Sequence, residues 1–130
     1  MTETRPRYGS ALEDEFALQL RAANIEFERE YRAAPGRKYR WDFLISGLLV
    51  EIQGGTWTKS GHTTGSGIER DLRKMNLATL HGYAVMAGTA DMVHSGELFE
   101  SVREWLDIKR SFDDVRDEIE IQSDMQEEDE

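Results

Sequence analysis

The sequence contains no cysteine and only two prolines in its 130 residues. The absence of cysteine excludes disulfide bonds and thiolate metal sites, and it is compatible with a reducing cytoplasm. No apolar run reaches the length that spans a membrane, and the first residues lack the apolar stretch of a signal peptide. The sequence therefore predicts a soluble, intracellular (cytoplasmic) protein with no membrane partner.

The excess of negative charge is concentrated at the C-terminal end. Residues 113–130 contain ten acidic side chains and one base, whereas the whole chain has a formal net charge of −10. The other 112 residues carry 16 acidic and 15 basic side chains, so a nucleic-acid surface on the body of the protein is not excluded. We predict a loose N-terminus at 1–9, one domain at 10–112 and an acidic tail at 113–130 that is disordered or weakly helical.

Hydrophobic periodicity predicts the order of the secondary-structure elements. Leu12, Phe16 and Leu20 have helical spacing and predict a helix from residue 10 to about residue 24. Three strands are expected at 25–31, 41–45 and 48–53, and their short connections favour an antiparallel meander. A helix at 68–82, a short strand at 83–86 and a last helix from residue 95 complete an α/β fold with a mixed central sheet.

Polar side chains converge at one end of the hairpin expected at 41–53. Asp42 and Glu51 lie at nearly equal distances from the tight turn at residues 46–47, so they should come close across the hairpin. Gln53 lies two residues beyond Glu51 and should share its face of the sheet. Two neighbouring carboxylates repel unless a cation or a proton lies between them. Such oxygen ligands suit Mg²⁺ or Mn²⁺, which phosphodiester hydrolysis uses to activate water.

Asp42 followed by Glu51 and Gln53 resembles the Asp…(Asp/Glu)-X-Lys signature of the PD-(D/E)XK nuclease superfamily. Glu13, three residues before Phe16 and seven before Leu20, is similar to the first-helix glutamate of archaeal-type Holliday-junction resolvases. The order helix, three-stranded meander, helix, strand matches the core of that restriction-endonuclease-like fold. A further stretch resembles the very-short-patch-repair and resolvase-like branch through Gly54, Gly55, Trp57, His62, Arg70, Asp71, Lys74, Asn76, Gly82 and Tyr83.

The resemblance implies a Mg²⁺-dependent endonuclease that hydrolyses DNA phosphodiester bonds, resolvase-like or repair-like. Glu13, Asp42, Glu51 and the carbonyl of Ile52 would hold the metal. Because resolvase-like enzymes cut two strands and many are dimers, a homodimer is one arrangement that the resemblance allows. A non-cleaving nuclease-fold module that binds branched or damaged DNA is the main alternative, and an adaptor acting through the acidic tail is a further one.

One position departs from the superfamily pattern. The usual lysine is Gln53 here, and an amide can orient a water molecule but brings no positive charge beside the phosphate. We expect a lysine to reach the site from elsewhere, with Lys74 in the second predicted helix as the first candidate and Lys59 in the glycine-rich segment as the second. Lys74 could also be merely one half of a helix-surface ion pair with Asp71.

Basic and aromatic residues flank the expected site on both sides. Nucleic-acid binding needs positive charge, and His62 is a candidate proton donor or phosphate contact. Trp57 could stack on a base or anchor its loop. The candidate DNA-binding residues are Arg37, Lys38, Arg40, Trp57, Lys59, Arg70 and Arg73.

Structural explanations are available for several of these residues. Glu13 could belong to a capping box that starts with Ser10. Asp42 could pair with Arg40 at an edge strand, and His62 could be a solvated loop residue. The bases could be ordinary surface charge balanced by acids at positions 26, 28 and 30.

Overall fold

The computed structural model describes residues 10–34, 39–53 and 65–128. The chain divides into two compact units, Met1–Phe99 and Glu100–Glu130. The predicted order of helices and strands is confirmed, with one short additional helix before the last one. The elements are α1 (Ser10–Ala22), β1 (Glu28–Tyr31), β2 (Trp41–Ile45), β3 (Leu48–Gln53), α2 (Gly65–Leu80), β4 (Ala84–Thr89), α3 (Ala90–His94) and α4 (Glu97–Glu128).

The four strands form one mixed sheet in the order β1-β2-β3-β4. β1, β2 and β3 are antiparallel neighbours, so the predicted meander is confirmed. The turn between β2 and β3 is tight because Ser46 and Gly47 both have positive φ, 52° and 91°, which is the backbone of a type I′ hairpin turn. β4 is parallel to β3, and α2 provides the crossover that a parallel neighbour requires.

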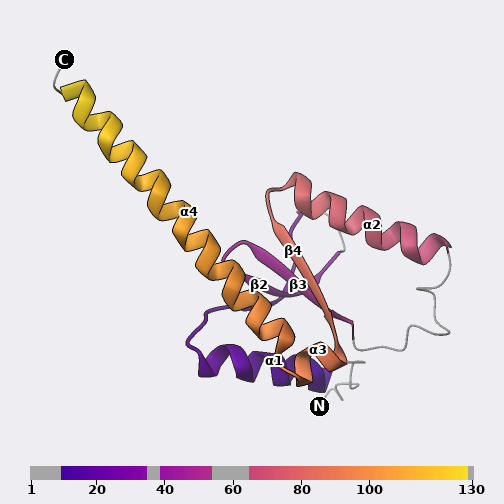
Figure 1. Ribbon diagram of the computed structural model, residues 1–130. Helices are drawn as coiled ribbons and strands as arrows, with labels where there is room; N and C mark the ends of the chain where they lie inside the picture. The colour runs from indigo at the N-terminus through magenta and orange to yellow at the C-terminus, as the bar shows by residue number, and fades with distance from the viewer. Residues whose placement is uncertain (1–9, 35–38, 54–64, 129–130) are drawn as a thin grey trace, which may run out of the picture. The chain divides into compact units, whose positions relative to one another are not determined.

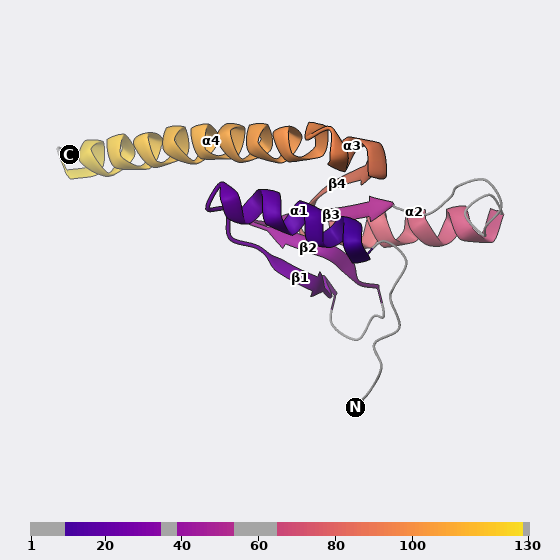
Figure 2. The ribbon, with the colours of Figure 1, turned by 90° about the horizontal axis from the view of Figure 1, so that it is seen from below.

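Helices cover both faces of this sheet (Figures 1 and 2). On one face Phe16 of α1 packs edge-on against Phe43 of β2, with 5.1 Å between the ring centroids, and both side chains are fully buried. On the other face Ala78 of α2 packs in a cluster with Trp41 and Leu49. The sheet therefore has an apolar layer on each face. α1 covers one face and α2 covers the other, so polar side chains of the two helices lie over different faces.

Two helices end in left-handed residues that direct the chain into the next strand. Asn24 after α1 and Gly82 after α2 have φ of 58° and 86°. In each case a backbone N–H one residue further on reaches back to a helix carbonyl: Ile25 donates to Leu20 and Tyr83 donates to Ala78. This is the Schellman pattern of helix termination, and it confirms the predicted helix stop at Gly82.

The second unit is the helical segment of α4 from Glu100 onwards. Figure 1 draws α4 as one continuous helix, and it ends at Glu128. Of the two readings of the acidic tail, disordered or weakly helical, the structure has helix at residues 113–128. Asp113 accepts from Lys109 and from Arg116, and pairs at this spacing stabilise a helix. Among the described helices, none is both long and apolar enough to cross a membrane.

Candidate metal centre

Three carboxylates from three different elements meet beside α1. Glu13 of α1, Glu30 of β1 and Asp42 of β2 each offer an oxygen, and these oxygens all lie within 4.8 Å of one another. Glu13 and Asp42 are buried, with 5% and 8% of their surfaces exposed, and Glu30 is half-buried. The sequence predicted Glu13 and Asp42 as partners, and it did not predict Glu30.

A change of face in β1 and β2 produces this cluster. Residues two apart in a regular strand point to the same side, yet Phe43 contacts Phe16 of α1 whereas Trp41 packs with Ala78 of α2. In the pairing of β1 with β2, Arg29 lies opposite Phe43 and Tyr31 lies opposite Trp41. Glu30 therefore lies opposite Asp42. Glu30 has a left-handed backbone, with φ of 54°. The strands therefore rotate at this point, and Glu30 and Asp42 both lie beside Glu13.

Arg29 supplies positive charge at the edge of the three carboxylates. Its guanidinium lies 3.6 Å from a carboxylate oxygen of Glu13 and donates to Asp14 at 2.8 Å. It also lies 5.5 Å from the centre of the Phe43 ring. Arg29 is therefore one positive group beside three clustered acids, two of which are buried. Such clustering is costly unless a cation or protons reduce the repulsion.

Asp42 is also tied to the strand that carries the second group of polar residues. Its Oδ2 accepts a hydrogen bond of 2.7 Å from the backbone N–H of Ile52. This buried bond fixes the carboxylate next to the residues on either side of Ile52. Asp42 is therefore the link between the carboxylates beside α1 and the polar side chains of β3.

Glu51 and Lys74 form an ion pair on the α2 face of the sheet. The ammonium of Lys74 lies 3.0 Å from Oε2 of Glu51 and 4.4 Å from the centre of the Trp41 ring. Burial, followed by the nearby charge of Asp42, raises the pKa of Glu51 from 4.5 to about 7, although the charge of Lys74 opposes the shift. A carboxyl group that titrates near neutral pH can exchange protons during a reaction.

The structure thus brings most of the predicted site residues together, but around two faces of the sheet. Glu13 and Asp42 are neighbours, and so are Glu51 and Lys74. The unbroken pairing of β3 with β4 places Gln53 on the face of Glu51, as the sequence predicted. We expected Asp42 to lie on that face too, but β2 rotates there and Asp42 lies on the α1 face. Asp42 is linked to the strand of Glu51 through its hydrogen bond with the backbone N–H of Ile52.

The predicted DNA-binding bases are divided between described and undescribed parts of the chain. Arg40 is exposed immediately before β2, and Arg70 and Arg73 are exposed on α2. Arg73 pairs with Glu69 one helical turn earlier, at 3.2 Å. The candidates that lie outside the described residues are Arg37, Lys38, Trp57, Lys59 and His62.

Glu30 is the residue that sequence reasoning missed. It alternates with two other acids, at positions 26 and 28, in a strand whose charges read as ordinary solvent-facing groups. The strand register that sets position 30 opposite Asp42 comes from the structure, because the sequence between the two strands does not determine it. The left-handed backbone that turns Glu30 toward Glu13 also leaves no trace in the sequence.

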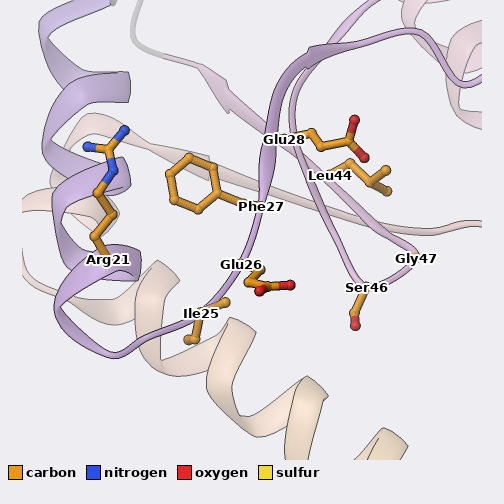
Figure 3. A pocket seen from close by; sticks show the side chains of 8 residues that line it. All are labelled: Arg21, Ile25, Glu26, Phe27, Glu28, Leu44, Ser46 and Gly47. Carbon is orange, nitrogen blue, oxygen red and sulfur yellow. The ribbon is translucent and has the colours of Figure 1, made fainter.

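A separate depression lies at the other end of β2, beside the Ser46–Gly47 turn (Figure 3). Its volume is about 760 Å³, and Arg21, Phe27 and Glu28 are among the residues that line it. None of the three clustered acids contributes to it. The depression is therefore distinct from the candidate metal centre.

The residues of the candidate centre fit a hard divalent cation. Mg²⁺ and Mn²⁺ prefer oxygen ligands, and carboxylates are the usual protein donors. Glu13, Glu30 and Asp42 supply such oxygens at the mutual spacing of ligands around one ion. A cation would also reduce the repulsion between the two buried acids, Glu13 and Asp42.

Comparison with known proteins identifies a fold relative. No family model and no curated protein matches the sequence. Among solved structures, the chain is similar to the homing endonuclease I-Bth0305I catalytic domain, with a TM-score of 0.52 and 18% identity. The match covers 73% of this chain and 88% of that domain. The likeness shows a nuclease-like fold, with a four-stranded mixed sheet flanked by helices.

Proposed function

We propose that this protein is a metal-dependent endonuclease that hydrolyses DNA phosphodiester bonds, in a resolvase-like or repair-like role. The observation that carries the proposal is the trio Glu13, Glu30 and Asp42, whose carboxylate oxygens lie within 4.8 Å of one another. The trio occurs on a fold similar to that of a homing endonuclease catalytic domain, which gives the acidic cluster a chemical context. DNA is accordingly the proposed substrate.

In this proposal Glu13, Glu30 and Asp42 hold one Mg²⁺ or Mn²⁺ ion. The carbonyl of Ile52 and the carboxylate of Glu51 are further candidate ligands, because Asp42 bonds to the backbone N–H of Ile52. A bound divalent ion supplies the charge that activates water and stabilises the leaving oxygen.

Lys74 takes the place of the lysine that position 53 lacks. It is held by Glu51 and by the Trp41 ring, so its charge is fixed close to the end of β3. Gln53, on the same face, orients the attacking water through its amide. Where Glu51 is not a ligand of the ion, its carboxylate accepts a proton from that water. His62 remains a candidate proton donor to the leaving oxygen.

Basic side chains on both sides of the centre would bind the DNA backbone. Charge on Arg and Lys supplies the sequence-independent part of DNA affinity, and among the described bases Arg40, Arg70 and Arg73 are exposed. The proposed phosphate-binding residues are Arg37, Lys38, Arg40, Lys59, Arg70 and Arg73, with Trp57 stacking on a base.

The proposal is tested by incubating the full chain with plasmid, single-stranded and four-way-junction DNA in the presence of Mg²⁺, Mn²⁺ or EDTA. We expect cleavage of at least one substrate with a divalent ion and none with EDTA. Asp42→Asn should reduce cleavage at least a hundredfold, whereas Glu28→Gln, an exposed acid of the same sheet, should not. DNA binding without cleavage under every metal would overturn the proposal and favour a non-cleaving DNA-binding module.

A further inference from the structure

The C-terminal helix carries a stripe of apolar side chains. Ile108, Phe112, Val115 and Ile119 of α4 are 49%, 72%, 53% and 61% exposed, and half-buried Trp105 precedes them. The intervals along these five residues are three, four, three and four. That spacing keeps all five on one side of a helix and is the pattern of a coiled-coil seam. We call these five residues the α4 seam.

Charges of opposite sign line the two sides of the α4 seam. With Trp105, Phe112 and Ile119 at the a positions, Ile108 and Val115 occupy the d positions. The flanking e positions then hold basic side chains, Lys109 and Arg116. Two of the flanking g positions hold acidic side chains, Glu104 and Glu118. Residues at e and g decide which helix pairs with which, and in which direction.

These charges select a second copy of the same helix in parallel orientation. In a parallel pair the g position of one helix faces the next e position of the other, so Glu104 of each copy faces Lys109 of the second copy. An antiparallel pair would instead set the basic flank against the basic flank and the acidic flank against the acidic flank, which is unfavourable.

The ion pairs within α4 do not prevent this arrangement. Lys109 lies 3.3 Å from Asp113, and both side chains are about 40% exposed, at 43% and 38%. Exposed pairs of this kind contribute little free energy, so Lys109 can turn toward a second helix at small cost. Burial of the α4 seam provides the favourable term, because large apolar side chains leave water on association.

We infer that α4 is a self-association element, which pairs in parallel with α4 of a second copy of this chain through the α4 seam. The inference does not depend on the proposed nuclease activity, because it rests on the sequence and exposure of α4 alone. It gives a structural basis for a homodimer, whether or not the protein cuts DNA.

The inference is tested first by the mass of the full chain in solution, using sedimentation equilibrium over a roughly hundredfold range of concentration. We expect twice the chain mass at the upper end and dissociation on dilution. Phe112→Gln should weaken association at least tenfold. Ile121→Gln is the matched control, because Ile121 is 58% exposed but lies on the opposite side of the helix, and it should leave association unchanged. Circular dichroism verifies that both variants keep the helix.

Orientation is tested with single cysteines, which the natural chain lacks. Gln122 is the next d position after Ile119, so Gln122→Cys should form a disulfide-linked dimer rapidly in a parallel pair. Asp117→Cys, on the outer side of the helix, should not. Glu104→Lys should weaken association several-fold, and adding Lys109→Glu should restore it. A monomeric mass at every concentration, or equal crosslinking at positions 117 and 122, would overturn the inference.

Discussion

The ammonium of Lys74 lies 3.0 Å from a carboxylate oxygen of Glu51, joining α2 to β3. Both side chains are largely covered, with 15% and 27% of their surfaces exposed, and Lys74 also rests on the ring of Trp41. The pair holds a positive charge against Glu51, two residues before Gln53 in the same strand.

Replacing Lys74 by methionine should weaken both the fold and the proposed reaction. Loss of the ammonium leaves a covered carboxylate without its partner, which costs about 1–3 kcal/mol, and a urea titration measures that loss. Cleavage should fall at least tenfold. Arg73→Met is the control, because Arg73 is 68% exposed and pairs only on the helix surface with Glu69. Equal effects of the two substitutions would contradict a special role for Lys74.

The pKa of Glu51 links the free energy of unfolding to pH. Because the folded-state pKa is raised from 4.5 to about 7, the folded protein holds this proton more tightly than the unfolded chain. The contribution of this group to stability is therefore full below pH 4.5 and is lost as pH rises to about 7, by at most about 3 kcal/mol. Denaturant titrations in EDTA should show that fall, and Glu51→Gln should flatten it. An unchanged slope in the variant would show that other groups produce the dependence.

Introducing a lysine at position 53 tests whether the missing charge is already supplied. Gln53→Lys would complete the Asp…(Asp/Glu)-X-Lys pattern that the sequence resembles, but Lys74 already pairs with Glu51 on the same face. We expect cleavage to change by less than about threefold, since a second cation there adds little that the first does not provide. A tenfold or greater gain in the rate of plasmid nicking would show that Lys74 does not fill the role.

The close approach of Gly88 to α4 can be tested by adding one methyl group. A Cβ at Gly88 would lie 2.8 Å from Cδ2 and 3.0 Å from Cδ1 of Leu98, which is fully buried. Gly88→Ala should therefore destabilise the protein by about 1–3 kcal/mol, measured by thermal or urea unfolding. Leu98→Val in the same chain should recover part of that loss. No loss in the single variant would contradict the tight packing of β4 on Leu98.

Sequence reasoning was accurate where local chemistry dominates. The apolar runs that form β2 and β3, and the turn at Ser46 and Gly47, are local signals, and both strands have the predicted bounds. Gly82 ended the second helix as expected, because glycine tolerates the left-handed backbone there. These features need no knowledge of tertiary contacts.

Prediction was poorer where tertiary geometry decides. Regular alternation placed Asp42 on the face of Glu51, but the rotation of β1 and β2 set it beside Glu13 and Glu30 instead. The composition of the acidic tail left disorder and weak helix both open, and the structure has helix to Glu128. Neither the rotation nor the pairing of Lys74 with Glu51 can be derived from periodicity alone.

The central claim is that Glu13, Glu30 and Asp42 hold a divalent cation, and a crystal of the full chain soaked in Mn²⁺ tests it most directly. We expect an anomalous difference peak among the three carboxylates, with ligand distances near those of an oxygen-bound divalent ion, about 2.0–2.3 Å. The peak should disappear in Asp42→Asn and persist in Glu28→Gln. Strong Mn²⁺ peaks elsewhere in the crystal, with none between Glu13, Glu30 and Asp42, would contradict the account.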